Sequence, residues 1–79
     1  MNKIKNMTID REKMAETLIS LRGDKTQQEV SEAVGISPSA LAMYEAGERV
    51  PRDEIKLRLA TYYHRKLEEL FFIPKVHEM

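Results

Sequence analysis

Apolar residues in the first third of the chain recur at the spacing of one buried helix face. They are Met14, Leu18 and Leu21, at positions i, i+4 and i+7. Thr8 or Asp10 precedes this stripe and can cap a helix, because a short polar side chain accepts a hydrogen bond from the first free N–H groups. Gly23 and Asp24 then interrupt the pattern. The sequence therefore predicts a helix that begins near Thr8 or Asp10 and ends at Arg22.

A second apolar stripe follows a capping signal. Thr26 and Glu29 fit the S/T-x-x-E capping box, in which each side chain accepts a hydrogen bond from the other residue's backbone N–H. Gly35 stands where helices commonly end in a left-handed residue, a conformation that glycine adopts at little cost. We therefore expect a helix between these two signals. Its expected inner face is Val30, Ala33 and Val34.

A third helix is predicted directly after this glycine. Ser37 can cap it, and Pro38 would occupy its first position, where the missing N–H is no loss. Gly47 is expected to close it. Two short helices joined by a tight glycine-containing turn form a helix-turn-helix, whose second helix can enter a major groove while the first crosses the DNA backbone. The residues expected to face inward are Leu41 and either Tyr44 or Glu45.

The remaining pattern predicts two more helices and no strand. Pro51 restarts the chain, and Asp53 and Glu54 suit a first helical turn because the helix dipole favours acids there. This fourth helix should run to about Tyr63, with Ile55, Leu59 and Tyr62 or Tyr63 inside. A short fifth helix, about Lys66 to Phe71, should bury Leu67 and Leu70, and Pro74 prevents its continuation. The fold class expected is all-α, a compact five-helix bundle.

Composition limits the function classes. At 79 residues the chain suits one domain, and it contains no cysteine for disulfides or thiolate metal sites. No segment approaches the roughly 18 apolar residues of a membrane span, so we expect a cytoplasmic protein without membrane contact. There is no nucleophile–base pair, glycine-rich phosphate loop or metal-ligand cluster, so we expect no enzyme, cofactor, metal or small-molecule ligand.

The distribution of charge argues against DNA binding by this helix-turn-helix. The formal net charge is zero, and residues 26–48 contain four acids but no Lys or Arg. Phosphate binding usually needs a basic surface. Positive charge for DNA would therefore come from the flanks, through Lys25, Arg49, Arg52 and Lys56. The acids leave an alternative open, an antitoxin or adaptor that uses the same fold to bind a basic protein partner.

Several motifs in register resemble the phage-repressor and Cro-like family of helix-turn-helix proteins, also called the XRE family. The resemblance covers roughly residues 12–72 and lies in "LISLR", "TQQEVSEAVGIS", "SALAMYEAGERVP" and "LEELF". It implies a lambda repressor-like DNA-binding domain over residues 9–72, after an N-terminal extension at 1–8 and before a tail at 73–79. It also implies a homodimeric transcriptional regulator, acting as a repressor, that recognises a palindromic operator in double-stranded DNA.

Site residues follow from the resemblance position by position. It implies an ion pair between Arg22 and Glu45 that joins the first and third helices. Phe72 and Ile73 exceed what a five-helix domain easily buries, so we expect a dimer contact there together with Leu70. The residues implied to face the bases are Ser37, Pro38, Ser39, Ala42 and Met43. The residues implied to contact phosphate are Thr26, Gln27, Gln28, Arg49 and Arg52.

Overall fold

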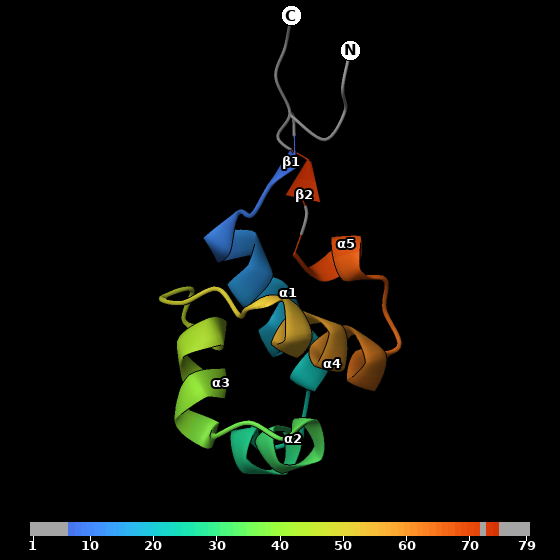
Figure 1. The fold of residues 1–79 in the computed structure, drawn as a ribbon. Helices are drawn as coiled ribbons and strands as arrows, with labels where there is room; N and C mark the ends of the chain where they lie inside the picture. The colour runs from blue at the N-terminus through green and yellow to red at the C-terminus, as the bar shows by residue number, and fades with distance from the viewer. Residues whose placement is uncertain (1–6, 72, 75–79) are drawn as a thin grey trace, which may run out of the picture.

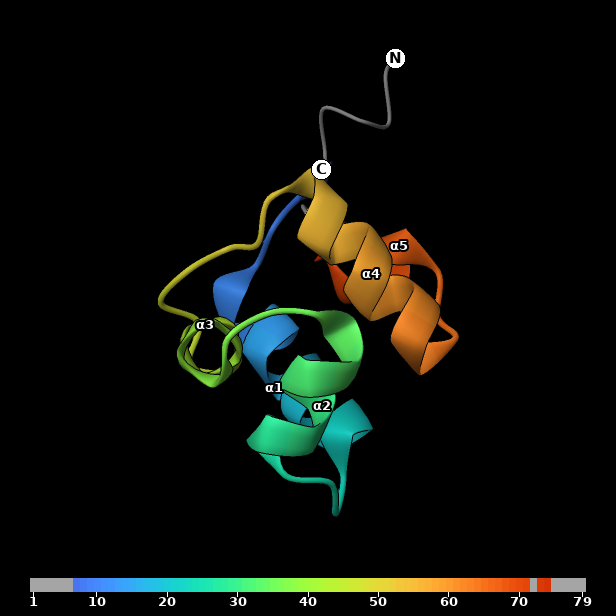
Figure 2. The same ribbon diagram turned by 60° about the horizontal axis from the view of Figure 1, so that its bottom comes forward.

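Five helices make up most of the described part of the chain, residues 7–71 and 73–74 of a computed structural model (Figure 1). The third of them packs against the first two and lies on the side of the molecule away from the fifth (Figures 1 and 2). The expected all-α five-helix class is confirmed. In chain order the helices are α1 (Arg11–Arg22), α2 (Gln27–Val34), α3 (Pro38–Glu45), α4 (Asp53–Tyr63) and α5 (Leu67–Leu70).

Local capping explains where the first two helices begin. The Asp10 carboxylate accepts hydrogen bonds from the N–H groups of Glu12 and Lys13, so α1 starts at the second of the two expected caps. Both bonds of the predicted capping box are present at α2, where Thr26 and Glu29 each accept from the other's N–H at 3.0 and 2.9 Å. These boundaries depend on side chains within a few residues of the helix start.

The core lies where the five helices meet. Apart from Pro51, the buried apolar side chains of the described residues belong to one cluster, and most had been predicted as inward. One expected member of α2 is wrong, because Ala33 is exposed. Ser31 is buried in that helix, with its hydroxyl donating to the Gln28 carbonyl at 3.0 Å. The cluster comprises Met14, Leu18, Val30, Val34, Leu41, Tyr44, Ile55, Leu59, Ala60, Leu70 and Phe71.

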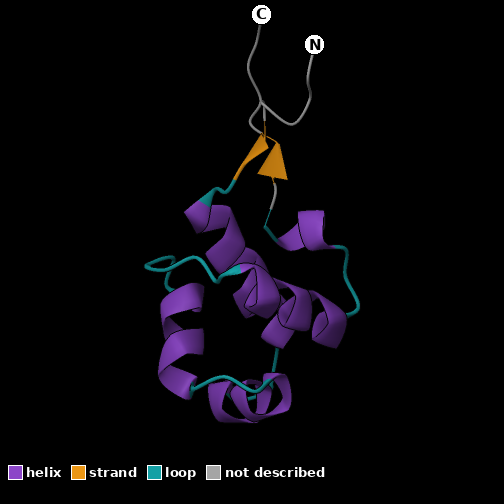
Figure 3. Ribbon diagram, in the orientation of Figure 1, coloured by secondary structure: helices purple, strands orange, loops and turns teal. Residues whose placement is uncertain are grey.

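Two very short strands bring the two ends of the described chain together (Figure 3). β1 (Met7–Thr8) pairs antiparallel with β2 (Ile73–Pro74), in the register Met7 to Pro74 and Thr8 to Ile73. The expectation of no strand was wrong here. Two-residue strands carry no detectable alternation of apolar and polar positions, so their pairing depends on where the helices place the chain ends.

A non-glycine residue ends α4. His64 adopts the left-handed conformation, with φ 56° and ψ 45°. Its N–H donates to the carbonyls of Ala60 and Thr61. A non-glycine residue in this conformation costs about 1–2 kcal/mol.

None of the described helices is both long and apolar enough to cross a membrane.

Candidate nucleic-acid interface

A tight turn between α2 and α3 determines the direction of the second helix. Gly35 ends α2 in the left-handed conformation, with φ 85°, and its N–H donates to the Ser31 carbonyl at 2.8 Å. Two residues later the Ser37 hydroxyl accepts from the Ala40 N–H at 3.0 Å and caps α3, with Pro38 in its first turn. The structure therefore contains the predicted helix-turn-helix.

One face of α3 is buried and the other is open. Leu41, Tyr44 and Glu45 pack into the bundle. Among the predicted base-facing residues, Ser37, Pro38 and Ser39 are exposed, Met43 is 38% exposed and Ala42 is half-buried. The Ser37 oxygen is already used as the cap, so its direct role is positional. The structure brings these five residues to one end and one side of α3; their contact with bases stays a prediction.

The predicted ion pair between α1 and α3 is present. Arg22 Nε lies 2.8 Å from Glu45 Oε2, and Arg22 Nη1 donates to the Lys25 carbonyl at 2.7 Å. The Glu45 side chain is only 3% exposed. Its hydrogen bond raises the pKa of Arg22 above the ordinary value, and the other Glu45 oxygen accepts from Gln27 Nε2 at 2.8 Å. One buried carboxylate thus joins α1, α2 and α3.

The start of α2 offers backbone rather than side-chain donors. Gln27 Nε2 donates to Glu45, and Gln28 Nε2 donates to Glu32 at 2.7 Å, so both amides have acceptors within the chain. The first backbone bond of α2 is made by the Val30 N–H, to the Thr26 carbonyl. The N–H groups of Gln27 and Gln28 precede that bond and lie at the positive end of the helix, which suits an anion.

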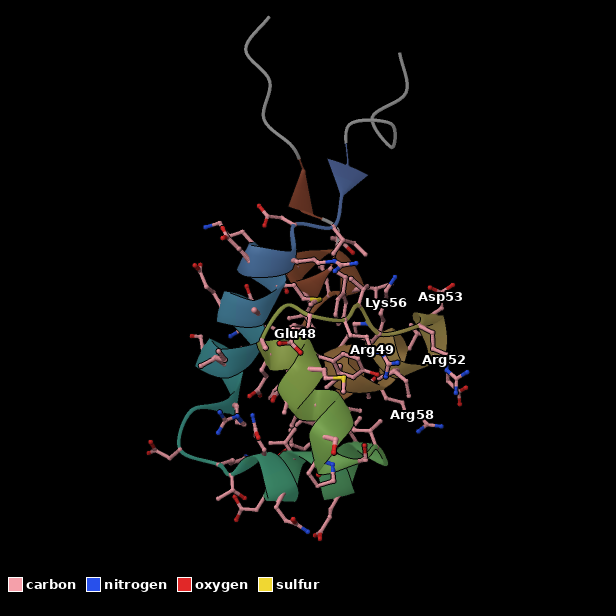
Figure 4. All side chains as sticks on the ribbon, turned by 90° about the vertical axis from the view of Figure 1, so that its left-hand side faces the viewer. Glu48, Arg49, Arg52, Asp53, Lys56 and Arg58 are labelled. Carbon is pink, nitrogen blue, oxygen red and sulfur yellow. The ribbon has the colours of Figure 1, made fainter. Side chains whose placement is uncertain are left out.

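Three arginines gather beside α3 (Figure 4). Arg49 and Arg52 are exposed in the loop between α3 and α4, and Arg58 of α4 is 42% exposed. They line a groove of about 540 Å³ between the start of α3 and α4. Arg58 was not among the predicted site residues. The available sequence signal was its position four residues after Glu54, one helical turn along the same face, which indicates an ion pair. Lys56 was expected to face DNA, but it is only 8% exposed.

The acids of residues 26–48 mostly have partners within the chain. Glu29 completes the α2 cap, Glu32 accepts from Gln28, and Glu45 accepts from both Arg22 and Gln27. Glu48 is exposed, next to Arg49 in the loop. The negative charge that opposed a DNA-binding interpretation is therefore largely engaged in capping, helix pairing and the core.

The predicted dimer contact needs correction. Leu70 is 0% exposed and belongs to the core of its own chain, so its assignment to a dimer interface was wrong. Its helix is only four residues long, and packing against α1 and α4 buries the apolar side. Phe72 lies outside the described residues. Ile73 contributes its backbone to β2.

Comparisons with known proteins agree with this arrangement. The family model described as Helix-turn-helix matches residues 18–70. The SOS-response transcriptional repressor LexA from Eubacterium rectale has a similar solved structure, with 26% identity, a TM-score of 0.73, and coverage of 100% of this chain and 82% of that chain. A transcriptional regulator from Listeria innocua is 27% identical, with a TM-score of 0.70 over 89% of this chain and 68% of that chain. No curated protein matches the sequence.

Proposed function

The chain belongs to the XRE-type helix-turn-helix family of DNA-binding transcription regulators, and we propose that it is a repressor that binds a palindromic operator as a homodimer. The observation that carries this proposal is the open face of α3, which follows the Gly35 turn and contains Ser39 and Met43. The similar structure from Eubacterium rectale is itself a transcriptional repressor by its title. Repression would follow from occupying DNA that a polymerase needs.

Base reading falls to the open face of α3. Met43 and Ala42 present apolar groups suited to thymine methyls, and the Ser39 hydroxyl can donate or accept. A serine hydroxyl discriminates poorly between bases, and the open face of α3 holds no side chain that makes bidentate base contacts. Part of the specificity therefore comes from DNA shape and from the spacing of the half-sites.

Anchoring to phosphate falls to residues on both sides of α3. The backbone N–H groups of Gln27 and Gln28 lie at the start of α2, which Thr26 caps, and we assign them as phosphate donors because both amide side chains have acceptors within the chain. Arg49 and Arg52 supply exposed positive charge from the loop after α3. Such contacts orient the protein on the duplex without reading its sequence.

Selection of bound duplexes from a random pool tests the whole proposal. A symmetric dimer predicts recovered sites with two inverted half-sites about 10 base pairs apart, centre to centre. Sedimentation with one recovered duplex should give two chains per duplex. Recovery of no enriched sequence, with retention of a co-purified protein instead, would favour the adaptor alternative.

Two substitutions separate reading from anchoring. Met43→Arg adds a bidentate guanine reader to the open face of α3, so repeating the selection should change the preferred bases. Arg52→Ala removes a phosphate contact, so it should weaken all duplexes alike and lower the salt slope by about one per subunit. Lys66→Ala, just before α5, is the charge-matched control and should leave binding unchanged. Identical behaviour of the first two variants would contradict the assigned roles.

A further inference from the structure

Arg58 reaches from α4 to the turn that precedes α3. Its Nη2 lies 2.6 Å from Glu54 Oε2, one helical turn earlier, and its Nη1 donates to the Gly35 carbonyl at 3.3 Å. A Cβ added at Gly35 would lie 3.3 Å from the same Nη1, so the guanidinium rests directly on the turn. These two contacts hold it at the C-terminal end of α2, where a cation is favourable.

The guanidinium keeps capacity for another partner. Arginine has five N–H donors in a planar fork, and the two contacts occupy only part of them. The Arg58 side chain is 42% exposed, and that of Glu54 is 66% exposed. A pair this exposed contributes little to stability, so the carboxylate can be exchanged for a stronger anion at small cost.

Arg58 lines a groove that also contains other positively charged side chains. Three arginines line the groove beside α3 (Figure 4). The one acid among the lining residues is Glu54. A phosphate is the anion that arginine binds bidentately and that a duplex on α3 would bring to this groove. The groove is lined by Ser37, the cap of α3, by Ala40 on α3, by Arg49 and Arg52 in the loop, and by Glu54 and Arg58 on α4, among others.

We propose that Arg58 is a further phosphate-binding residue of the interface and that Glu54 is its internal competitor. Without DNA the Glu54 carboxylate occupies the fork; when a duplex lies on α3, a backbone phosphate replaces it, while the Gly35 carbonyl keeps the guanidinium in place. This inference rests on the proposed DNA-binding function. Glu54 thereby lowers affinity for every duplex.

If Glu54 and phosphate compete for Arg58, removing the acid should raise DNA affinity and removing the arginine should lower it. Glu54→Gln frees Arg58 and should tighten binding to the recovered duplex about two- to fivefold at about 0.1 M salt. Arg58→Gln should weaken binding and lower the salt slope by about one per subunit. In the double variant the gain from Glu54→Gln should disappear, because the freed arginine is absent.

Asp53→Asn is the matched control. Asp53 lies in the same first turn of α4, is 96% exposed, pairs with Lys56 at 3.4 Å and does not line the groove. Removing its charge should change affinity less than twofold and equally with or without Arg58. Urea unfolding of every variant checks that the fold is retained.

Each outcome decides between the two claims. If the unaltered chain retains no duplex, the proposed function and this inference both fail. If it binds but Glu54→Gln weakens or leaves binding unchanged, Glu54 and Arg58 are a structural brace and only the inference fails. The inference also fails if Glu54→Gln tightens binding equally in the absence of Arg58, since the effect is then general charge removal, as Asp53→Asn would also show.

Discussion

At the scale of single residues, Glu45 organises the site. Its carboxylate is almost fully buried, yet both oxygens have donors, Arg22 on one and Gln27 on the other. A buried charge is tolerated only when it is paired and hydrogen-bonded. Because these donors come from α1 and α2 while Glu45 is on α3, the same pairing orients the helix that we propose to read DNA.

Removing one partner should therefore cost stability. Arg22→Ala leaves Glu45 charged and buried with one remaining donor, and we expect a loss of about 2–4 kcal/mol in the free energy of unfolding. Arg65→Ala, at an exposed arginine, should change it by less than about 0.5 kcal/mol. Urea unfolding measures both. Equal stability of the two variants would show that the Glu45 pair contributes nothing beyond a surface contact.

Tyr63 presents the opposite situation, a buried polar atom without a partner. Its hydroxyl has no hydrogen-bond partner among the described residues. Burial, followed by the nearby negative charge of Glu45, raises the pKa of Tyr63 from the ordinary 10 to about 12. Such an orphan group lowers stability by about 1–3 kcal/mol relative to a satisfied one.

Tyr63→Phe should consequently be neutral or stabilising at pH 7. The folded pKa of Tyr63 lies above its unfolded pKa, so stability does not depend on this group below about pH 10. From pH 10 towards 12 the hydroxyl ionises more readily in the unfolded chain, and stability falls. The stability difference between the original chain and Tyr63→Phe should thus shift in favour of the variant over that interval. Urea unfolding at stepped pH measures it; a constant difference would contradict the raised pKa.

At the scale of elements, the Gly35 turn decides how α3 is presented. Its positive φ of 85° is a conformation in which glycine carries no Cβ penalty. The local signals here, Gly35 and the Ser37 cap, are two residues apart and were readable from sequence. The angle between α2 and α3 was not, because it also depends on Leu41 and Tyr44 packing into the core.

Two substitutions at the turn test its conformation. Gly35→Ala should destabilise by about 1–2 kcal/mol, because a Cβ is disfavoured at this φ. Gly35→Asn should cost less, because asparagine tolerates the left-handed region. Both added side chains meet Arg58 Nη1, the mobile end of a long side chain, so the difference between them isolates the backbone effect. Thermal unfolding compares them, and equal losses would point to the Arg58 contact instead.

At the scale of the whole molecule, positive charge is concentrated locally but does not exceed negative charge. The formal net charge is zero, and most acids of residues 26–48 are engaged within the chain. Exposed arginines gather instead at the groove beside α3. A protein of this kind attracts DNA locally and weakly at a distance, because long-range steering depends on the overall field.

Binding should depend on salt through the phosphates that the protein contacts locally. About three to five phosphates contacted per subunit correspond to six to ten per dimer, and to a loss of roughly 10³ to 10⁵ in affinity between about 50 and 200 mM salt. Titration of one recovered duplex at stepped salt gives the slope. A slope near zero would mean that no counterions are released, and phosphate contacts could not then anchor the protein.

Helix boundaries were determined by the sequence itself, because each depends on contacts within a few residues. Asp10, Thr26 and Ser37 accept N–H groups at most three positions away, and Gly35 needs only its own backbone freedom. The Arg22–Glu45 pair followed from family resemblance, since its partners are 23 residues apart. These local signals were enough to predict the helix-turn-helix and the open face of α3 as candidates.

Only the tertiary structure showed which polar and charged side chains are already buried or paired within the chain. Lys56 is buried, Gln27 binds Glu45, and Arg58 rests on the Gly35 turn. Each contact joins residues on different helices or depends on how the helices pack, and neither periodicity nor capping specifies that packing. The same holds for the pairing of β1 with β2, which joins residues 7–8 to 73–74. Helices are encoded locally, whereas the partners of their side chains exist only once the bundle has closed.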